Sequence, residues 1–140
     1  MKKTFILKNK HSETRMLANG VMDFGKENDL DQNVLGDIRL ALEEMFSNIV
    51  SYGFEDDREH EIVLDMELST DLLTMKIRDD GWPFNPTEYF NPDLEKPLDE
   101  REVGGLGIHL VRHVIDDWEY KSEQGKNTLT MKKRIRESVH

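Results

Sequence analysis

The chain contains no cysteine in its 140 residues. This absence excludes disulfide bonds and thiolate metal ligands, and it fits a reducing compartment. Long apolar runs are also missing, because no stretch approaches the roughly 18 apolar residues that a membrane-spanning helix needs. The short N-terminal run Phe5-Ile6-Leu7 is not followed by a small-residue cleavage site, so it indicates a strand rather than a signal peptide. We therefore expect a cytoplasmic protein that does not enter the membrane.

Positive charge is scarce, since 19 Lys and Arg residues stand against 29 Asp and Glu residues and give a formal net charge of −10. Nucleic-acid binding depends on clustered Lys and Arg side chains that displace condensed counterions. The acidic balance therefore argues against a nucleic-acid partner. If such a chain binds a polyphosphate, backbone N–H groups and a divalent cation must supply much of the positive potential.

The chain has the composition of a globular protein, with 36% hydrophobic and 34% charged residues. A chain of this length buries a real core but is short for two domains. We therefore interpret residues 1–140 as a single domain. The acidic, proline-containing segment at about 85–104 has no clear period, and such segments in compact domains are often lids or binding loops.

Periodicity predicts the secondary structure. Helical spacing of apolar residues, including Met16 and Leu17, favours a first helix, and Asp31 is a suitable N-cap for a second. The expected order is strand 4–7, helix 13–28, helix 31–53, strands 62–68 and 73–78, irregular segment 85–103, helix 106–115, a strand at 118–122, a turn at 124–125 and a strand at 128–133. Adjacent strands with few helices indicate a two-layer α/β (α+β) sandwich, in which helices pack on one face of a mixed, mostly antiparallel sheet.

Glu44 and Asn48 lie four residues apart in the second expected helix, so they share one face about 6 Å apart along its axis. Both fall on the same side of the apolar stripe, whereas Glu43 falls on the other side. A carboxylate beside an amide suits Mg²⁺, which prefers hard oxygen donors and keeps several waters. The alternative is a solvent-exposed polar edge.

Asp79 ends an expected strand and precedes Gly81 in the sequence DDGWPF. A carboxylate at that place can accept a hydrogen bond from the amino group of adenine, whereas the carbonyl group of guanine would be repelled. Gly81 would let the backbone pass close to the ring. The alternative is an ordinary turn, because Asp-Gly pairs are common turn formers.

Gly104, Gly105 and Gly107 open the last expected helix. Glycines permit close backbone approach, and free N–H groups in a first helical turn form an anion site. The sequence is not a Walker A loop, because no Gly-Lys-Ser/Thr follows, and no βαβ unit surrounds it as in a dinucleotide fingerprint. The alternative is a flexible hinge before a helix.

These signatures resemble the GHKL-type ATP-binding fold, and more closely the bacterial anti-sigma-factor serine/threonine kinases. The resemblance covers nearly the whole chain. The matching segments are ALEEMFSNIVSYGF (41–54), RDDGWPFNP (78–86), LDEREVGGLGIHLVRHVIDDWEY (98–120), which is the most specific, and KNTLTMKKR (126–134).

By matched position, the resemblance implies a catalytic base and a metal ligand on one helix. Glu44 would take a proton from the attacking hydroxyl, and Asn48 would hold the Mg²⁺ that bridges the phosphates of ATP. Asp79 would bind the adenine amino group, with Gly81 beneath the ring.

The resemblance also assigns the glycine cluster and the last strand. Gly104, Gly105 and Gly107 would hinge an ATP lid and turn the helix N-terminus toward the phosphates. Thr128 would lie near the adenine and contact it through a water, although the strand lacks the Gly-Thr pair of many relatives. Arg101 would reach the phosphates from the lid.

The function implied by the resemblance is that of an ATP- and Mg²⁺-dependent protein-serine/threonine kinase. Its substrate would be a STAS-type anti-sigma antagonist, and sequestration of a sigma factor is a further activity within the group. Relatives often dimerise, so a homodimer is also expected. Phosphoryl transfer requires mainly positioning and charge stabilisation, so a sparse site suffices.

Two other interpretations remain open. A non-catalytic, nucleotide-gated partner-switching module is one, although a pure binder needs Asn48 more than Glu44. The ATPase domain of a histidine kinase is the other, although the sequence leaves no room for a phosphoacceptor helical hairpin before the first strand.

Overall fold

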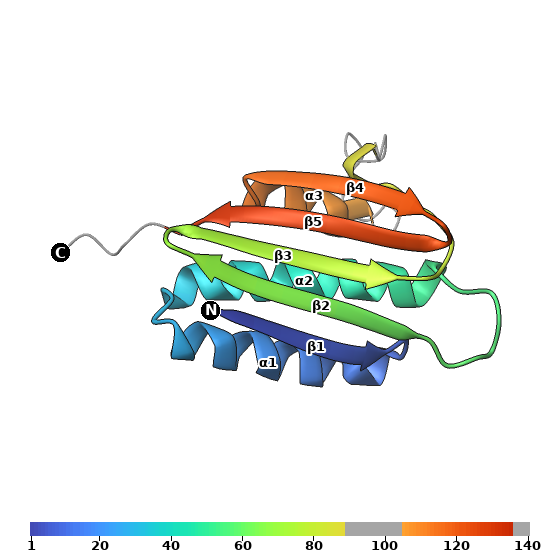
Figure 1. Ribbon diagram of the computed structural model, residues 1–140, viewed down its shortest axis with the longest axis horizontal. Helices are drawn as coiled ribbons and strands as arrows, with labels where there is room; N and C mark the ends of the chain where they lie inside the picture. Colours follow the sequence, from blue (N-terminus) through green and yellow to red (C-terminus); the bar gives the residue numbers. More distant parts are fainter. Residues whose placement is uncertain (89–104, 136–140) are drawn as a thin grey trace.

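In the computed structural model, which describes residues 1–88 and 105–135, five strands form one sheet and three α-helices lie against one of its faces (Figure 1). The strand order is β1-β2-β3-β5-β4, and every neighbouring pair is antiparallel. The predicted two-layer sandwich with helices on one face is therefore confirmed. Within these residues the sheet is antiparallel throughout rather than mixed.

The elements follow the predicted order. The strands are β1 (Lys2–Lys8), β2 (Glu61–Ser69), β3 (Leu72–Asp79), β4 (Asp117–Glu123) and β5 (Lys126–Arg134). The helices are α1 (Thr14–Glu27), α2 (Gln32–Tyr52) and α3 (Gly105–Val114), with 3₁₀ turns η1 (His11–Glu13) and η2 (Pro86–Glu88). No helix in the described ranges combines the length and apolar character that crossing a bilayer requires.

The core lies between the sheet and the helices. Alternation along β2 and β3 buries one side chain in two, and the buried set is Ile62, Leu64, Met66, Leu73, Met75 and Ile77. Each such apolar side chain contributes about 1.5–3 kcal/mol when fully buried. The stripe of α1 contributes Leu17, whereas the adjacent Met16 is 53% exposed. The prediction that Met16 belongs to this stripe is therefore wrong, because one residue turns the helix by about 100°.

The start of α2 is fixed by its capping residue. The Asp31 carboxylate accepts hydrogen bonds from the N–H groups of Asn33 at 2.8 Å and Val34 at 3.2 Å, which confirms the predicted N-cap. Such a cap contributes about 1 kcal/mol relative to alanine. It sets where the 21-residue helix begins and so the direction in which each later side chain points.

The turn between β4 and β5 sets which β5 side chains face the helices. Gln124 and Gly125 both have positive φ angles, 52° and 75°, as a two-residue type I′ hairpin requires. This confirms the predicted turn. In the strand that follows, Asn127 pairs with Asp79 at the end of β3.

Candidate nucleotide-binding site

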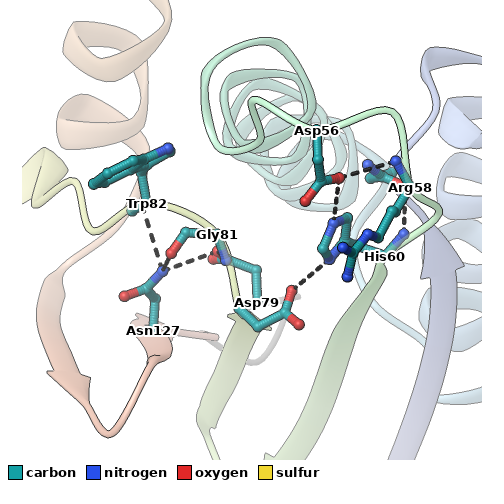
Figure 2. A network of polar contacts seen from close by, with 9 residues as sticks. Asp56, Arg58, His60, Asp79, Gly81, Trp82 and Asn127 are labelled. Carbon is teal, nitrogen blue, oxygen red and sulfur yellow. Dashed lines mark hydrogen bonds and ion pairs between the residues drawn. The ribbon is translucent and has the colours of Figure 1, made fainter.

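Asp79 ends β3 on the same face of the strand as the buried Leu73, Met75 and Ile77, which is the side of the sheet that carries the helices. Its Oδ1 atom accepts two hydrogen bonds, from the Gly81 N–H at 2.9 Å and from the Asn127 amide at 3.0 Å (Figure 2). Burial raises the pKa of the Asp79 carboxyl above its usual range and Asp80 adds to the rise, whereas these two hydrogen bonds lower it. Asp79 is thus an oriented and partly desolvated acid.

The Asn127 side chain is the one buried polar group among the described residues, with 3% of the residue exposed. Its nitrogen donates to Asp79 Oδ1 and, at 2.9 Å, to the Gly81 carbonyl. Its oxygen accepts from the hydroxyls of Tyr120 at 3.1 Å and Ser122 at 2.8 Å. A buried amide is costly unless its donors and acceptor are bonded, and this amide meets that condition.

The structure places Thr128, the β5 residue that the resemblance assigned to the site, on the other face of the sheet. Thr128 pairs with Arg78, and both line a depression on the outer face. Successive strand residues point to opposite faces, so the inward neighbour of Asp79 is Asn127 and not Thr128. Asn127 was not among the predicted site residues. The available signal was its position in the inward alternation that includes Leu129.

The turn after Asp79 packs against the end of α2. The Trp82 N–H donates to the Gly53 carbonyl at 2.7 Å, and a Cβ on Gly81 would lie 2.3 Å from the same oxygen. Only glycine permits this approach of two backbones. The structure therefore gives Gly81 a packing role, and its predicted place beneath a purine ring stays a prediction.

Glu44 lies where α2 meets α3. A Cβ on Gly107 would be 2.3 Å from Glu44 Oε2, so the missing side chain of Gly107 leaves room for the carboxylate. Gly105 begins α3 and Gly107 lies in its first turn, where backbone N–H groups have no acceptor within the helix. Gly104 lies outside the described residues. The structure thus brings Glu44 to a helix N-terminus, a place that favours anions.

Asn48 follows one turn after Glu44 on α2. Both side chains are half-buried, and neither forms a hydrogen bond or ion pair with another residue of the described ranges. The helix from Glu44 to Gly53 spans about 14 Å. It therefore links the first turn of α3 to the turn that carries Asp79. The Asn48 amide oxygen suits Mg²⁺, which accepts few protein ligands. In the described part of the chain, no group of three or more His, Asp or Glu side chains is placed so that it could hold a metal ion.

His60 holds the loop after α2 beside the same turn. Its Nε2 lies 2.8 Å from Asp56 Oδ1 and its Nδ1 lies 3.1 Å from Asp80 Oδ1, while its ring stacks on Phe54 at a centroid distance of 4.3 Å. The Asp56 hydrogen bond is the main cause that raises the pKa of His60, and Asp80 also raises it, against the lowering effect of burial. Figure 2 shows this network beside Asp79.

Arg112 of α3 anchors the first residues of the predicted lid. Its guanidinium donates to the carbonyls of Pro86 at 3.3 Å and Thr87 at 3.0 Å, and it lies 5.7 Å from the ring centroid of Trp118. The start of the segment at 85–104 is therefore fixed to α3. The rest of that segment, including Arg101, lies outside the described residues.

Residues 7–133 match the protein family described as the histidine kinase-like ATPase domain. Because the match covers most of the chain, the chain belongs to the histidine kinase-like ATPase family, as the resemblance implied.

Named relatives narrow the class further. The serine/threonine-protein kinase BtrW of Bordetella bronchiseptica is 31% identical over 94 residues, which make up 67% of this chain and 66% of that protein. The anti-sigma F factor of Clostridium perfringens is 26% identical over 102 residues, which make up 72% of this chain and 73% of that protein. The chain thus matches about two thirds to three quarters of the length of these curated relatives. It is a homologue of proteins named as serine/threonine kinases and anti-sigma factors.

A solved structure supports the fold. The RsbU and RsbW domains of a Mycobacterium tuberculosis protein superpose with a TM-score of 0.70 at 15% identity, over 96% of this chain and 32% of that one. At this identity the likeness shows the fold alone, and it agrees with the two-layer architecture.

Proposed function

We propose that the chain is an ATP- and Mg²⁺-dependent protein-serine/threonine kinase that phosphorylates a STAS-type anti-sigma antagonist. One observation carries the proposal: α2 holds Glu44 against the first turn of α3, and its far end packs on the turn that orients Asp79. The names of the relatives, a serine/threonine-protein kinase and an anti-sigma factor, support it. Binding of a sigma factor is the partner interaction that the second name suggests.

Asp79 would select the base. One carboxylate oxygen is held by Gly81 and Asn127, and the other is left to accept a hydrogen bond from the adenine amino group. Guanine presents a carbonyl oxygen at the corresponding position and would be repelled. The proposal therefore requires a preference for ATP over GTP.

Asn48 and the first turn of α3 would bind the phosphates. The half-buried Asn48 amide oxygen has no partner in the described ranges, and the N–H groups at Gly105 and Gly107 lack helical acceptors. Mg²⁺, when bound, would neutralise charge on the phosphate oxygens. An acidic chain with few cations in its described site needs such backbone and metal contributions.

Glu44 would act as the general base. It would accept the proton of the substrate serine or threonine hydroxyl as that oxygen bonds to the γ-phosphorus, while the bond from the γ-phosphorus to the β–γ bridging oxygen breaks and ADP leaves. Its place beside the first turn of α3 puts the carboxylate next to the proposed phosphate site. General bases of this kind contribute about 10²–10⁴-fold to rates.

The test is transfer of labelled γ-phosphate from ATP to a purified STAS-type antagonist. Glu44→Gln should reduce transfer by about a hundredfold or more while ATP binding persists. Glu43→Gln, on the other side of the helix, is the matched control and should leave transfer intact. Equal transfer by wild type and Glu44→Gln would exclude Glu44 as the base.

Calorimetric binding of ATP with no transfer to any antagonist would instead favour the nucleotide-gated partner-switching module. Absence of ATP binding at millimolar concentration would overturn both. Sedimentation of the same preparation tests the expected homodimer, and pull-down with candidate sigma factors tests sequestration.

A further inference from the structure

Asn127 has no role in any of the assignments above, yet its buried amide lies beside Asp79, the residue proposed to bind the adenine. We propose that Asn127 is a positioning residue that turns the free oxygen of Asp79 toward the adenine amino group and thereby sets the preference for adenine. This inference rests on the proposed ATP site.

The two carboxylate oxygens of Asp79 differ in their hydrogen bonds. Both Asn127 and the Gly81 N–H donate to Oδ1, at 3.0 and 2.9 Å. No residue of the described ranges donates to Oδ2. Two donors on one oxygen fix the rotation of the carboxylate. Oδ2 then remains as a preoriented acceptor for a ligand.

The Asn127 amide has a single orientation in which all of its hydrogen bonds are satisfied. Its two N–H bonds go to Asp79 Oδ1 and the Gly81 carbonyl, and its oxygen accepts from Tyr120 and Ser122. A flipped amide would set its oxygen against two acceptors. Since both N–H bonds are used, Asn127 has none left for the base and acts through Asp79.

The Asn127 amide also affects the charge of Asp79. Burial disfavours the ionised form of Asp79, and the Asn127 hydrogen bond favours it. The amide therefore keeps a partly desolvated carboxylate charged. A charged acceptor forms a stronger hydrogen bond with an amino group than a neutral acid does.

The strand register makes the arrangement specific to this residue. Asn127 faces Asp79 directly across the β3–β5 pair, and the Tyr120 hydroxyl that holds the amide also accepts from the Phe84 N–H at 2.9 Å. The network thus reaches from the sheet to the segment that leads into η2. Thr130, on the outward side of the same strand, lies outside it and provides a control position.

The experiment compares two nucleotides by calorimetry in the presence of Mg²⁺: ATP and purine riboside triphosphate, which lacks the 6-amino group. Wild type should bind ATP about ten- to a hundredfold more tightly, as expected for a hydrogen bond to a charged acceptor. Asn127→Ala should weaken the binding of ATP by about tenfold and leave the binding of the analogue nearly unchanged. The ratio of the two affinities should therefore fall toward one. Thr130→Ala should keep the wild-type ratio. Equal losses for both nucleotides, or an unchanged ratio, would overturn the inference.

A matched pair of variants covers the case in which Asn127→Ala does not fold. Asn127→Thr and Asn127→Val have nearly the same shape and suit a strand, but only threonine retains a donor. Threonine should preserve more of the adenine preference than valine, and equal ratios would contradict the inference. The pKa of Asp79, followed by carboxyl-carbon NMR without nucleotide, should be higher in the valine variant. Wild type that binds no ATP would refute the proposed function itself, whereas ATP binding with equal losses refutes only the role of Asn127.

Discussion

The Glu44 carboxylate of α2 lies in the space that a side chain on Gly107 of α3 would need, because a Cβ at position 107 would be 2.3 Å from Glu44 Oε2. The contact fixes where the Glu44 carboxylate lies relative to the first turn of α3. Because the obstructed atom is the end of a flexible side chain, the carboxylate can move aside while the helices stay packed. The proposed catalytic role of Glu44 can therefore be tested at this contact separately from the stability of the fold.

Gly107→Ala should therefore displace Glu44 with little loss of stability. We expect phosphate transfer to fall by about a hundredfold, the scale of a 1 Å misplacement, while the midpoint of thermal unfolding stays within a few degrees. Gly36→Ala is the control, because nothing lies within 4 Å of its added Cβ, and it should stabilise α2 by about 1 kcal/mol without affecting transfer. Unchanged transfer in Gly107→Ala would contradict the assignment of Glu44.

Gly81→Ala should behave differently, because its Cβ would meet the backbone carbonyl of Gly53 at 2.3 Å. A backbone atom cannot rotate away, so the turn must separate from the end of α2. We expect a loss of about 1–3 kcal/mol in the free energy of unfolding, measured in urea, together with weaker ATP binding. A variant as stable as wild type would show that the turn tolerates the shift.

Asp79→Asn should weaken ATP binding and stabilise the nucleotide-free protein at neutral pH. Burial raises the folded-state pKa of Asp79 above its unfolded value, so the ionised acid is disfavoured in the fold. The ionised acid therefore lowers the free energy of unfolding of wild type at pH values above the raised pKa. This loss vanishes as pH falls below the usual pKa of about 3.9. Urea unfolding of both proteins across this range checks the sign. A stabilisation that persists in acid would contradict the titration argument.

His60→Gln should reduce the pH dependence of stability near neutrality. Protonated His60 bonds to Asp56 and Asp80, and its pKa is raised. The stabilisation is therefore fully present below the unfolded pKa of about 6.5 and is lost as pH rises through the higher folded value. The midpoint of thermal unfolding of wild type should fall as pH rises across that window, and the midpoint of the variant should change less. Parallel curves would exclude His60 as the titrating group.

Local signals allowed much of the fold to be predicted from the sequence. The Asp31 cap and the Gln124-Gly125 turn depend on neighbouring residues and are confirmed. The strands alternate as predicted, and the two-layer architecture follows from them. The end of β3 also placed Asp79 on the inward side, because its position depends only on its own strand.

The remaining features depend on pairing between distant segments. Alternation along β5 separates the faces of Asn127 and Thr128, but only the register with β3 sets Asn127 opposite Asp79. Glu44 and Gly107, which meet where α2 contacts α3, are 63 residues apart in the sequence. The strand register and the helix contact both join segments that are far apart in the sequence, so neither could be read from one chain alone.

Asn127 is held by two hydroxyls of the edge strand and holds a carboxylate of the strand on its other side. A slip of one residue between β4 and β5 would remove both hydroxyls from the amide at once. The edge strand β4 thus holds the amide that, in the proposed function, orients the acceptor for the adenine amino group. Loss of either hydroxyl, from Tyr120 or from Ser122, should therefore reach the proposed nucleotide site through Asn127, although both belong to a strand that is not paired with β3.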